Sequence, residues 1–358
     1  MPSISIVIPC HNRAYDLIKT LKAYDCQNVD EPFELIAIDD ASVDETYELL
    51  TSYRPKHYSL RVEHQEKNLG PASARNRGIL LSQAPLILFA GDDIVPHPLL
   101  IRGHLAAHRF YKGKEIAVLG QVLWPQDLPV NTLMVHIDGI GAQQFSYYYF
   151  QDGRQYDYRH LYTANVSLKR EFLLSQEKLF DTDFKYAAFE DVELSYRLSR
   201  NGLRIIYSSH LKGYHYHYYN IWTFSDRMFR VGMMAHLMIQ KHPKSRIRIL
   251  GRKWPLRIAR WKLMEPFRRL SLERTQRLET QLLHRSSSYE WSSHPFLDDL
   301  YIKILTYFFF KGVIYGIYGE THHAQKVNNL CADEYLTPLV KQFSEGSNHL
   351  GKILTHAL

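Results

Sequence analysis

The chain has 358 residues, of which 45% are hydrophobic and 23% are charged, and its formal net charge is +7. This composition allows a sizeable core and is ordinary for a globular protein. The basic surplus indicates a phosphate-bearing partner, such as a nucleotide, a nucleic acid or an anionic lipid. Three cysteines, Cys10, Cys26 and Cys331, show no metal-site spacing and cannot all pair with one another, which favours a reducing compartment.

The start of the chain and its apolar runs argue against export. The first apolar run is too short for a signal peptide and lacks a basic leader. No stretch reaches about 18 uninterrupted apolar residues, the usual mark of a membrane-spanning helix. We therefore expect a cytoplasmic protein, with peripheral contact at the inner face of the membrane as an open alternative.

The first 90 residues alternate between short apolar strands and helices. We expect a strand over 3–8 that ends at Pro9, followed by a helix capped by Asn12 or Asp16. Further strands are expected over 33–38, 60–63 and 85–89, and further helices over 42–53 and 71–81. Such alternation predicts an α/β domain with a mainly parallel sheet, whose ligands bind at the carboxyl ends of the strands. The pairs His11-Asn12, Asp39-Asp40 and Asp92-Asp93 each follow a strand and should face one cleft.

The rest of the chain is less regular. A strand over 116–119, an aromatic run over 145–150, a helix over 191–200 and a strand over 203–207 are expected. Between Lys241 and Arg285 there are 14 Lys or Arg residues against 3 Glu, interleaved with apolar residues. This pattern predicts a basic amphipathic helix. That helix would dock on an anionic membrane surface, pack on the catalytic core as a helical subdomain, or form a dimer interface.

Two acidic pairs carry the first chemical signals. Asp39-Asp40 at a strand tip can accept hydrogen bonds from a pyrimidine imide or a ribose hydroxyl, or can serve as a turn or helix cap. Asp92-Asp93, in the segment FAGDDIVPHP, offers the hard oxygen ligands that Mg²⁺ or Mn²⁺ takes beside a diphosphate, or is an ordinary turn.

Three further features support an anionic ligand and acid–base chemistry. The turn at Asn68 and Gly70 opens a helix and would present free N–H groups to an anion, with Arg75 one turn further on. Glu190-Asp191 at a helix start is favoured by the helix dipole and also supplies a candidate general base. His215 and His217, which alternate in a strand, either complete a metal shell or are structural.

Five segments in order resemble the successive motifs of family 2 glycosyltransferases with the GT-A fold. They are PCHNR, IAIDDAS, KNLGPASARNRGI, ILFAGDDIVPHP and FEDVELSYRLSRNG, and the resemblance covers roughly residues 3–235. One departure is Gly91, which stands where the usual Asp-X-Asp motif carries an acid. The resemblance implies an α/β GT-A domain, Rossmann-like, over 1–240, with a nucleotide-binding half (1–110) and an acceptor half (111–240). A basic, mainly helical region over 241–358 would follow as a C-terminal extension.

The resemblance also implies roles for individual residues. Pro9, His11 and Arg13 would border the base and ribose, Asp40 would hold the base, and Asp39 would support its loop. Asn68, Gly70 and Arg75 would lie near the diphosphate. Asp93 would bind Mn²⁺ or Mg²⁺, Asp92 would contact ribose or metal, and His215 or His217 would be the metal-side histidine. Asp191 would be the catalytic base and Glu190 would orient the acceptor, with Asn165 and Tyr148 as acceptor contacts.

These residues together predict an inverting, metal-dependent glycosyltransferase with a nucleotide-sugar donor, UDP-sugars being favoured. The acceptor would be a hydroxyl in a polysaccharide, a lipid-linked glycan or another glycoconjugate. A non-catalytic GT-A-like partner that binds nucleotide-sugars or glycans is the alternative. Nucleic-acid binding is not expected, because no known motif appears. The oligomeric state is open, with a dimer as one option.

Overall fold

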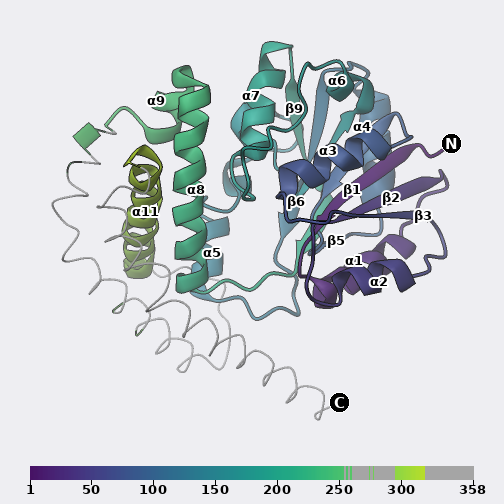
Figure 1. The fold of residues 1–358 in the computed structure, drawn as a ribbon, viewed down its shortest axis with the longest axis horizontal. Helices are drawn as coiled ribbons and strands as arrows, with labels where there is room; N and C mark the ends of the chain where they lie inside the picture. The colour runs from purple at the N-terminus through teal and green to yellow at the C-terminus, as the bar shows by residue number, and fades with distance from the viewer. Residues whose placement is uncertain (254, 257–258, 260–273, 275–276, 278–294, 319–358) are drawn as a thin grey trace, which may run out of the picture. The chain divides into compact units, whose positions relative to one another are not determined.

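Figure 1 shows the computed structural model, which describes residues 1–253, 255–256, 259, 274, 277 and 295–318. The described residues form two compact units, Met1–Tyr218 and a second unit that starts at Tyr219. We expected the division at residue 240, but α8 (Ile221–Lys241) belongs to the second unit. Most of the predicted basic helix lies outside the described residues. Within that segment the structure contains a short 3₁₀ turn and α9 (Arg246–Leu250).

The described residues of the first unit contain one sheet with the strand order β3-β2-β1-β4-β8-β6-β9-β5, and β7 pairs with β9. The strands are β1 (Ile4–Cys10), β2 (Phe33–Asp39), β3 (Ser59–His64), β4 (Leu86–Ala90), β5 (Ile94–Pro96), β6 (Ile116–Leu123), β7 (Gln155–Tyr156), β8 (Asn165–Lys169) and β9 (Arg204–His215). Strands β1 to β4 are mutually parallel, and β6 is parallel to β9. Strand β8 runs antiparallel to both β4 and β6, so the predicted α/β class with a largely parallel sheet is confirmed.

Helices cover both faces of this sheet. The helices of the first unit are α1 (Ala14–Asp25), α2 (Thr46–Ser52), α3 (Pro71–Leu81), α4 (Leu100–Phe110), α5 (Thr132–Asp138), α6 (Arg170–Leu174) and α7 (Glu190–Arg200). Alternate residues of β1 face opposite sides: Ile4, Ile6 and Ile8 pack with α1, α2 and α4, while Val7 packs with α3. Figure 1 shows α1 and α2 on one side of β1 to β3 and α3 on the other. Because β1 to β4 are parallel, their carboxyl ends lie at a single edge of the sheet.

Four local expectations were wrong in detail. Strand β1 continues through Pro9 to Cys10, and beyond Val7 it pairs with β2 only. Neither predicted side chain caps α1, because Asn12 Oδ1 accepts a hydrogen bond from a different loop and Asp16 lies inside the helix. Helix α2 starts later than expected, at Thr46. Strand β9 is much longer than the predicted 203–207 and carries His215 as its last residue.

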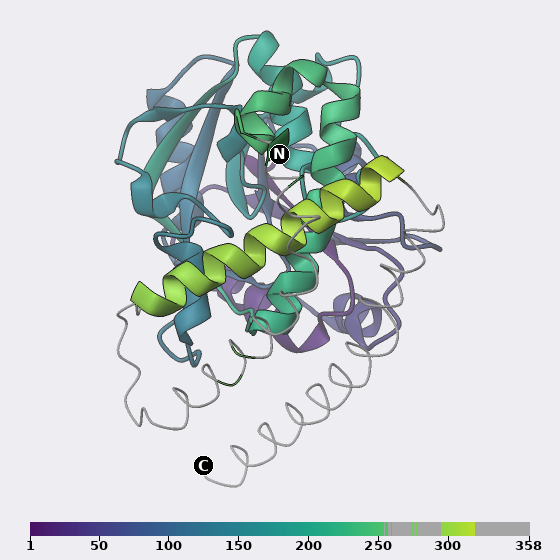
Figure 2. The same ribbon diagram turned by 90° about the vertical axis from the view of Figure 1, so that its left-hand side faces the viewer.

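In the second unit, α8 packs against α11 (Pro295–Tyr318), as Figure 2 shows. Glycines bring the two backbones together: a Cβ on Gly232 would lie 2.0 Å from the carbonyl oxygen of Phe309, and one on Gly312 would lie 1.9 Å from that of Phe229. The span Phe296–Ile317 has a mean hydropathy of 1.4 and, by length and composition alone, could cross a membrane. Because 44% of that window is buried, the same values fit an ordinary core helix, and we assign it no membrane role.

Replacement of Gly312 by alanine tests the contact between α8 and α11. A helical Gly→Ala change without a steric clash stabilises a protein by about 1 kcal/mol. Here the new methyl group would meet the backbone of Phe229, and overpacking costs about 1–3 kcal/mol. We expect a lower Tm for Gly312→Ala and little change for the control Thr306→Ala on the exposed side of α11. An unchanged or higher Tm for Gly312→Ala would contradict the contact.

Candidate active site

His11, just after β1, connects the loops that follow β1, β2 and β4. Its Nδ1 lies 2.8 Å from the carbonyl oxygen of Asp40, which can only accept, so Nδ1 carries the proton. Its Nε2 then accepts from the side-chain amides of Asn12 and Asn68, each 3.1 Å away. The backbone N–H of His11 donates to Asp92 Oδ2 at 3.3 Å. His11 therefore links the loops that carry the predicted nucleotide residues.

The carboxylate of Asp40 is 4% exposed and accepts three hydrogen bonds from the chain itself. Its Oδ1 binds the N–H of Leu69 at 2.8 Å and the amide of Gln65 at 2.7 Å, and its Oδ2 binds the N–H of Gly70 at 2.8 Å. The expectation that this turn offers free N–H groups is therefore wrong at these two residues. Gly70 has a φ of +86°, and a Cβ there would lie 2.5 Å from the carbonyl oxygen of Lys185, so only glycine fits.

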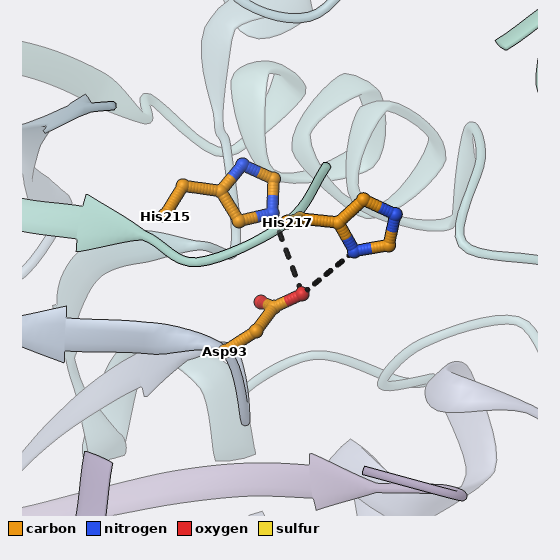
Figure 3. A group of neighbouring side chains, drawn as sticks. All are labelled: Asp93, His215 and His217. Atoms are coloured by element: carbon orange, nitrogen blue, oxygen red, sulfur yellow. Dashed lines mark hydrogen bonds and ion pairs between the residues drawn. The ribbon is translucent and has the colours of Figure 1, made fainter. Parts of the chain in front are cut away.

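Asp93, His215 and His217 form a compact group, shown in Figure 3, whose ligand atoms all lie within 4.8 Å of one another. His215 Nε2 lies 3.4 Å from Asp93 Oδ2, and His217 Nδ1 lies 3.1 Å from the same oxygen. Strand pairing produces this group, because Ile94 of β5 is paired with His215 of β9. Although burial opposes it, the contacts with both histidines lower the pKa of Asp93 well below its usual value.

The contacts of His217 test whether this group suits a cation. Arg13 Nη1 lies 3.1 Å from His217 Nδ1, and a guanidinium can only donate. The same Nδ1 lies 3.1 Å from Asp93 Oδ2. Burial lowers the pKa of His217, which favours the neutral imidazole that binds a metal. A mixed carboxylate and imidazole set is a suitable ligand set for a divalent metal.

Asp92 lies beside this group but is not one of the three grouped ligands. Its carboxylate lies 3.9 Å from Arg13 Nε, and Arg13 Nη2 lies 3.7 Å from Asp93. Burial and the charge of Asp93 raise the pKa of Asp92 to about 7. One arginine thus serves both acids of the pair that follows β4.

Arg75, Glu190 and Asp191 form a second group. Arg75 is 6% exposed, and its Nη1 donates to Glu190 Oε1 at 2.9 Å. Arg75 is thus committed to a carboxylate of this chain, whereas the resemblance implies a position near a diphosphate. Asp191 is half-buried, and it accepts hydrogen bonds from the N–H groups of Val192 and Thr163. Burial, with the charge of Glu190 adding to it, raises the pKa of Asp191 to about 7 against the opposing effect of Arg75.

Aromatic side chains connect the two groups. The ring of Phe145 lies 6.4 Å from that of His215 and 5.2 Å from that of Tyr162. Burial raises the pKa of Tyr162, and the nearby negative charge of Asp191 raises it further. The sheet places both groups at one edge, because Ala90 at the end of β4 is paired with the first residue of β8, just after Thr163.

One predicted acceptor residue, Asn165, is structural, and its assignment to the acceptor site was wrong. It is 1% exposed, and its Oδ1 faces His104 Nε2 at 3.0 Å. Its Nδ2 donates to the carbonyl oxygens of Leu211 at 2.9 Å and Gln121 at 3.2 Å. The amide therefore ties β8 to α4, β6 and β9 and has no exposed surface for a sugar. Tyr148, the other predicted acceptor residue, is 63% exposed in a 3₁₀ turn.

The sequence analysis missed three residues of this edge. His64 Nδ1 lies 2.7 Å from Asp39 Oδ2, an oxygen that also accepts from the N–H of Ser42, and Asp39 is completely buried. His64 is the last residue of β3, so the rule that strand tips carry the site would have identified it. Trp124, which stacks on His215, follows β6 and could have been found in the same way. Asp138, at the end of α5, had no such signal.

The fold and the site define an α/β protein with a nucleotide-binding type of sheet edge, a candidate cation site and a candidate base. A sequence model described as glycosyl transferase family 2 matches residues 5–189. The chain therefore belongs to glycosyl transferase family 2, and the predicted family is confirmed.

Proteins similar to this chain include a relative found by sequence and two solved structures. Validoxylamine A glucosyltransferase of Streptomyces hygroscopicus subsp. jinggangensis is 26% identical over 234 residues, which cover 57% of this chain and 53% of that protein. The chain thus matches about half the length of this relative. A mannosyltransferase from Pyrobaculum calidifontis, solved with GDP-Man and Mn²⁺, has a TM-score of 0.56 at 14% identity and covers 89% of this chain and 88% of its own.

A third similar protein is Staphylococcus aureus TarS 1–349 in complex with UDP. It has a TM-score of 0.51 at 15% identity and covers 90% of this chain and 93% of its own. At these identities the two structural comparisons establish the fold alone, and they confirm the predicted GT-A class.

The structural role of Asn165 leads to a stability prediction. Asn165→Ala removes the partner of His104 Nε2 and one hydrogen bond to each of two strand carbonyl groups, and a buried polar group left without a partner costs about 1–3 kcal/mol. We expect a loss of about 3 kcal/mol in the free energy of unfolding, measured in urea. The control is Asn28→Ala, whose side chain is exposed. Equal stability of the two variants would contradict this role.

Proposed function

We propose that this protein is an inverting, metal-dependent glycosyltransferase that transfers a sugar from a nucleotide-sugar, with UDP-sugars favoured, to an acceptor hydroxyl. One observation carries the proposal: a group fit for a cation and a half-buried carboxylate with a raised pKa lie at the same edge of the sheet. Membership of a glycosyltransferase family supports the reaction class.

Asp93, His215 and His217 would hold the divalent metal. When bound, such a metal neutralises the negative charge that grows on a departing nucleoside diphosphate. Two imidazoles among three ligands favour Mn²⁺ over Mg²⁺, which prefers oxygen ligands alone. The mannosyltransferase with Mn²⁺ supports a metal of this kind. Arg13 would add a fixed positive charge from the protein.

The donor nucleotide would lie along the loops that follow β1, β2 and β4. His11 holds these loops together, and Asp40 fixes the turn at Gly70, so the bed for the nucleotide is assembled before any ligand arrives. The UDP complex of TarS supports the favoured nucleotide, while the mannosyltransferase with GDP-Man keeps GDP open. Pro9 would border the base of the nucleotide, and Asp39 would support the loop that follows β2.

Asp191 would act as the general base. The acceptor oxygen attacks the anomeric carbon, its proton passes to Asp191, and the bond from that carbon to the diphosphate oxygen breaks with its electron pair leaving on the diphosphate. A single displacement inverts the configuration. The ion pair with Arg75 keeps Glu190 in place beside the base. The exposed Tyr148 and the aromatic run around it would provide the acceptor surface, since sugars bind to aromatic rings.

We further propose a cytoplasmic location. Among the described residues, Cys10 and Cys26 are free thiols, which fits a reducing compartment. A membrane-surface contact through residues 241–285 remains a hypothesis from the sequence, because most of this segment lies outside the described residues.

Replacement of the base tests the proposed mechanism. Asp191→Asn keeps the shape of the side chain but removes its basicity, and loss of a general base lowers rates by about 10²–10⁴-fold. We expect such a loss in UDP release from the donor, with binding of UDP and Mn²⁺ retained in a thermal-shift assay. Glu177→Gln, which removes an exposed acid, is the control. Turnover of Asp191→Asn near that of wild type would refute the assignment.

The raised pKa of Asp191 predicts the pH dependence of the reaction. The carboxyl must lose its proton before it can accept one, so the active form dominates above a pH of about 7. Below that pH, kcat/KM should fall about tenfold per unit, and above it the value should level off. The residual activity of Asp191→Asn should not show this fall at low pH. A fall that persists unchanged in the variant would show that another group causes it.

A further inference from the structure

His215 differs from His217 in how it is held. His215 is 6% exposed, and its Nε2 faces Asp93, while Figure 3 shows its other ring nitrogen pointing away from that carboxylate. To bind a cation through Nε2, the ring must carry its proton on the opposite nitrogen. A residue that fixes the plane of the ring and favours this tautomer would therefore tune the cation site without touching the cation.

Trp124 fixes the plane of the ring. Its indole stacks on the imidazole of His215, with centroids 5.2 Å apart and an angle of 11° between the planes. The indole is itself anchored, because its Nε1 donates to the carbonyl oxygen of Met134 in α5 at 3.3 Å. Phe145 lies on a further side of the imidazole, 6.4 Å away. Rotation of His215 out of this plane would break the stack.

Asp138, the last residue of α5, places a buried carboxyl group within electrostatic range of the same ring. Its Oδ1 is buried, and among the described residues it has no hydrogen-bond partner. Burial raises the pKa of Asp138 to about 7, and the charge of His215 opposes that rise, so the two side chains are within electrostatic range. Both Asp138 and the anchor of Trp124 come from α5, which makes this helix the support of one metal-side histidine.

We propose that Trp124 and Asp138 are positioning residues that hold His215 in the orientation and tautomer needed to bind a divalent cation. Trp124 sets the plane of the ring, and the carboxyl group of Asp138, when ionised, favours the tautomer whose Nε2 carries no proton. Carboxylates behind metal-bound histidines commonly have this effect, and their loss weakens metal binding by about 10–100-fold. The inference rests on the metal site of the proposed function and extends it to two residues outside the ligand group.

The test measures binding of Mn²⁺ alone to the full chain, by the loss of the electron paramagnetic resonance signal of free Mn²⁺. We expect Asp138→Asn to weaken binding by about 10–100-fold and Asp138→Glu to restore part of it. Trp124→Leu should weaken binding more than Trp124→Phe, which keeps a flat ring. Asp30→Asn removes an exposed acid elsewhere and serves as the control for net charge. Circular dichroism and Tm identify any variant that fails to fold.

A double-mutant cycle with His215→Ala separates positioning from a general charge effect. If Asp138 acts through His215, Asp138→Asn should cause no further loss of Mn²⁺ affinity in the His215→Ala chain. Equal losses in both backgrounds, or wild-type affinity of Asp138→Asn, would overturn the role of Asp138, and wild-type affinity of Trp124→Leu would overturn that of Trp124. A wild-type chain that binds no Mn²⁺ would instead refute the metal site of the proposed function, and this inference with it.

Discussion

The candidate site depends on the carboxylate of Asp40, which closes one turn by accepting hydrogen bonds from two successive N–H groups. Through this turn the loop after β3 is joined to the end of β2. His11 joins the same region to the loops after β1 and β4. Asp40 is almost fully buried, so it supports the candidate site by fixing the position of the loops around it. Parallel strands supply the common edge, and side-chain hydrogen bonds convert that edge into a defined surface.

Charge is distributed over this surface in alternating fashion. Arg13 lies between the two acids that follow β4, and Arg75 lies against Glu190 beside the candidate base. Asp92, Asp93 and Glu190 therefore each have a cation or an imidazole beside them, which offsets the cost of a buried charge. The two arginines act locally, whereas Asp93, His215 and His217 offer a ligand set that could hold a divalent cation. In the proposed function, the group around Asp93 would hold a cation and Asp191 would accept a proton.

The sequence predicted most of the fold and of the site because both follow from short-range patterns. Strand ends that carry polar pairs indicated the edge, and the order of the motifs indicated the family. Side-chain contacts between distant segments could not be predicted in this way. Nothing local to Asn165 reveals that its amide joins β8 to α4, β6 and β9. Likewise, the partner of Arg75 is 115 positions away in the chain, so the choice between a diphosphate and Glu190 needed the structure.

The missed residues show a different limit. His64 ends a strand that was predicted, but single histidines are common and the residue carries no motif. Asp138 lies in a region of weak periodicity, where no element could be assigned from the sequence. Predictions were therefore weakest over residues 111–240, where the chain departs from regular alternation of strand and helix.

The close approach of Gly70 to the carbonyl oxygen of Lys185 limits which parts of this protein can change by substitution. Two main chains, and not two side chains, set the spacing between the nucleotide loops and the segment that leads into α7. A contact between two main chains cannot be relieved by a change of side-chain rotamer. It also cannot be relieved by a smaller residue, because glycine already has no side chain. In the proposed enzyme, changes of specificity would therefore arise elsewhere, among the aromatic residues around Tyr148, while the turn at Gly70 keeps its distance from the segment that leads into α7.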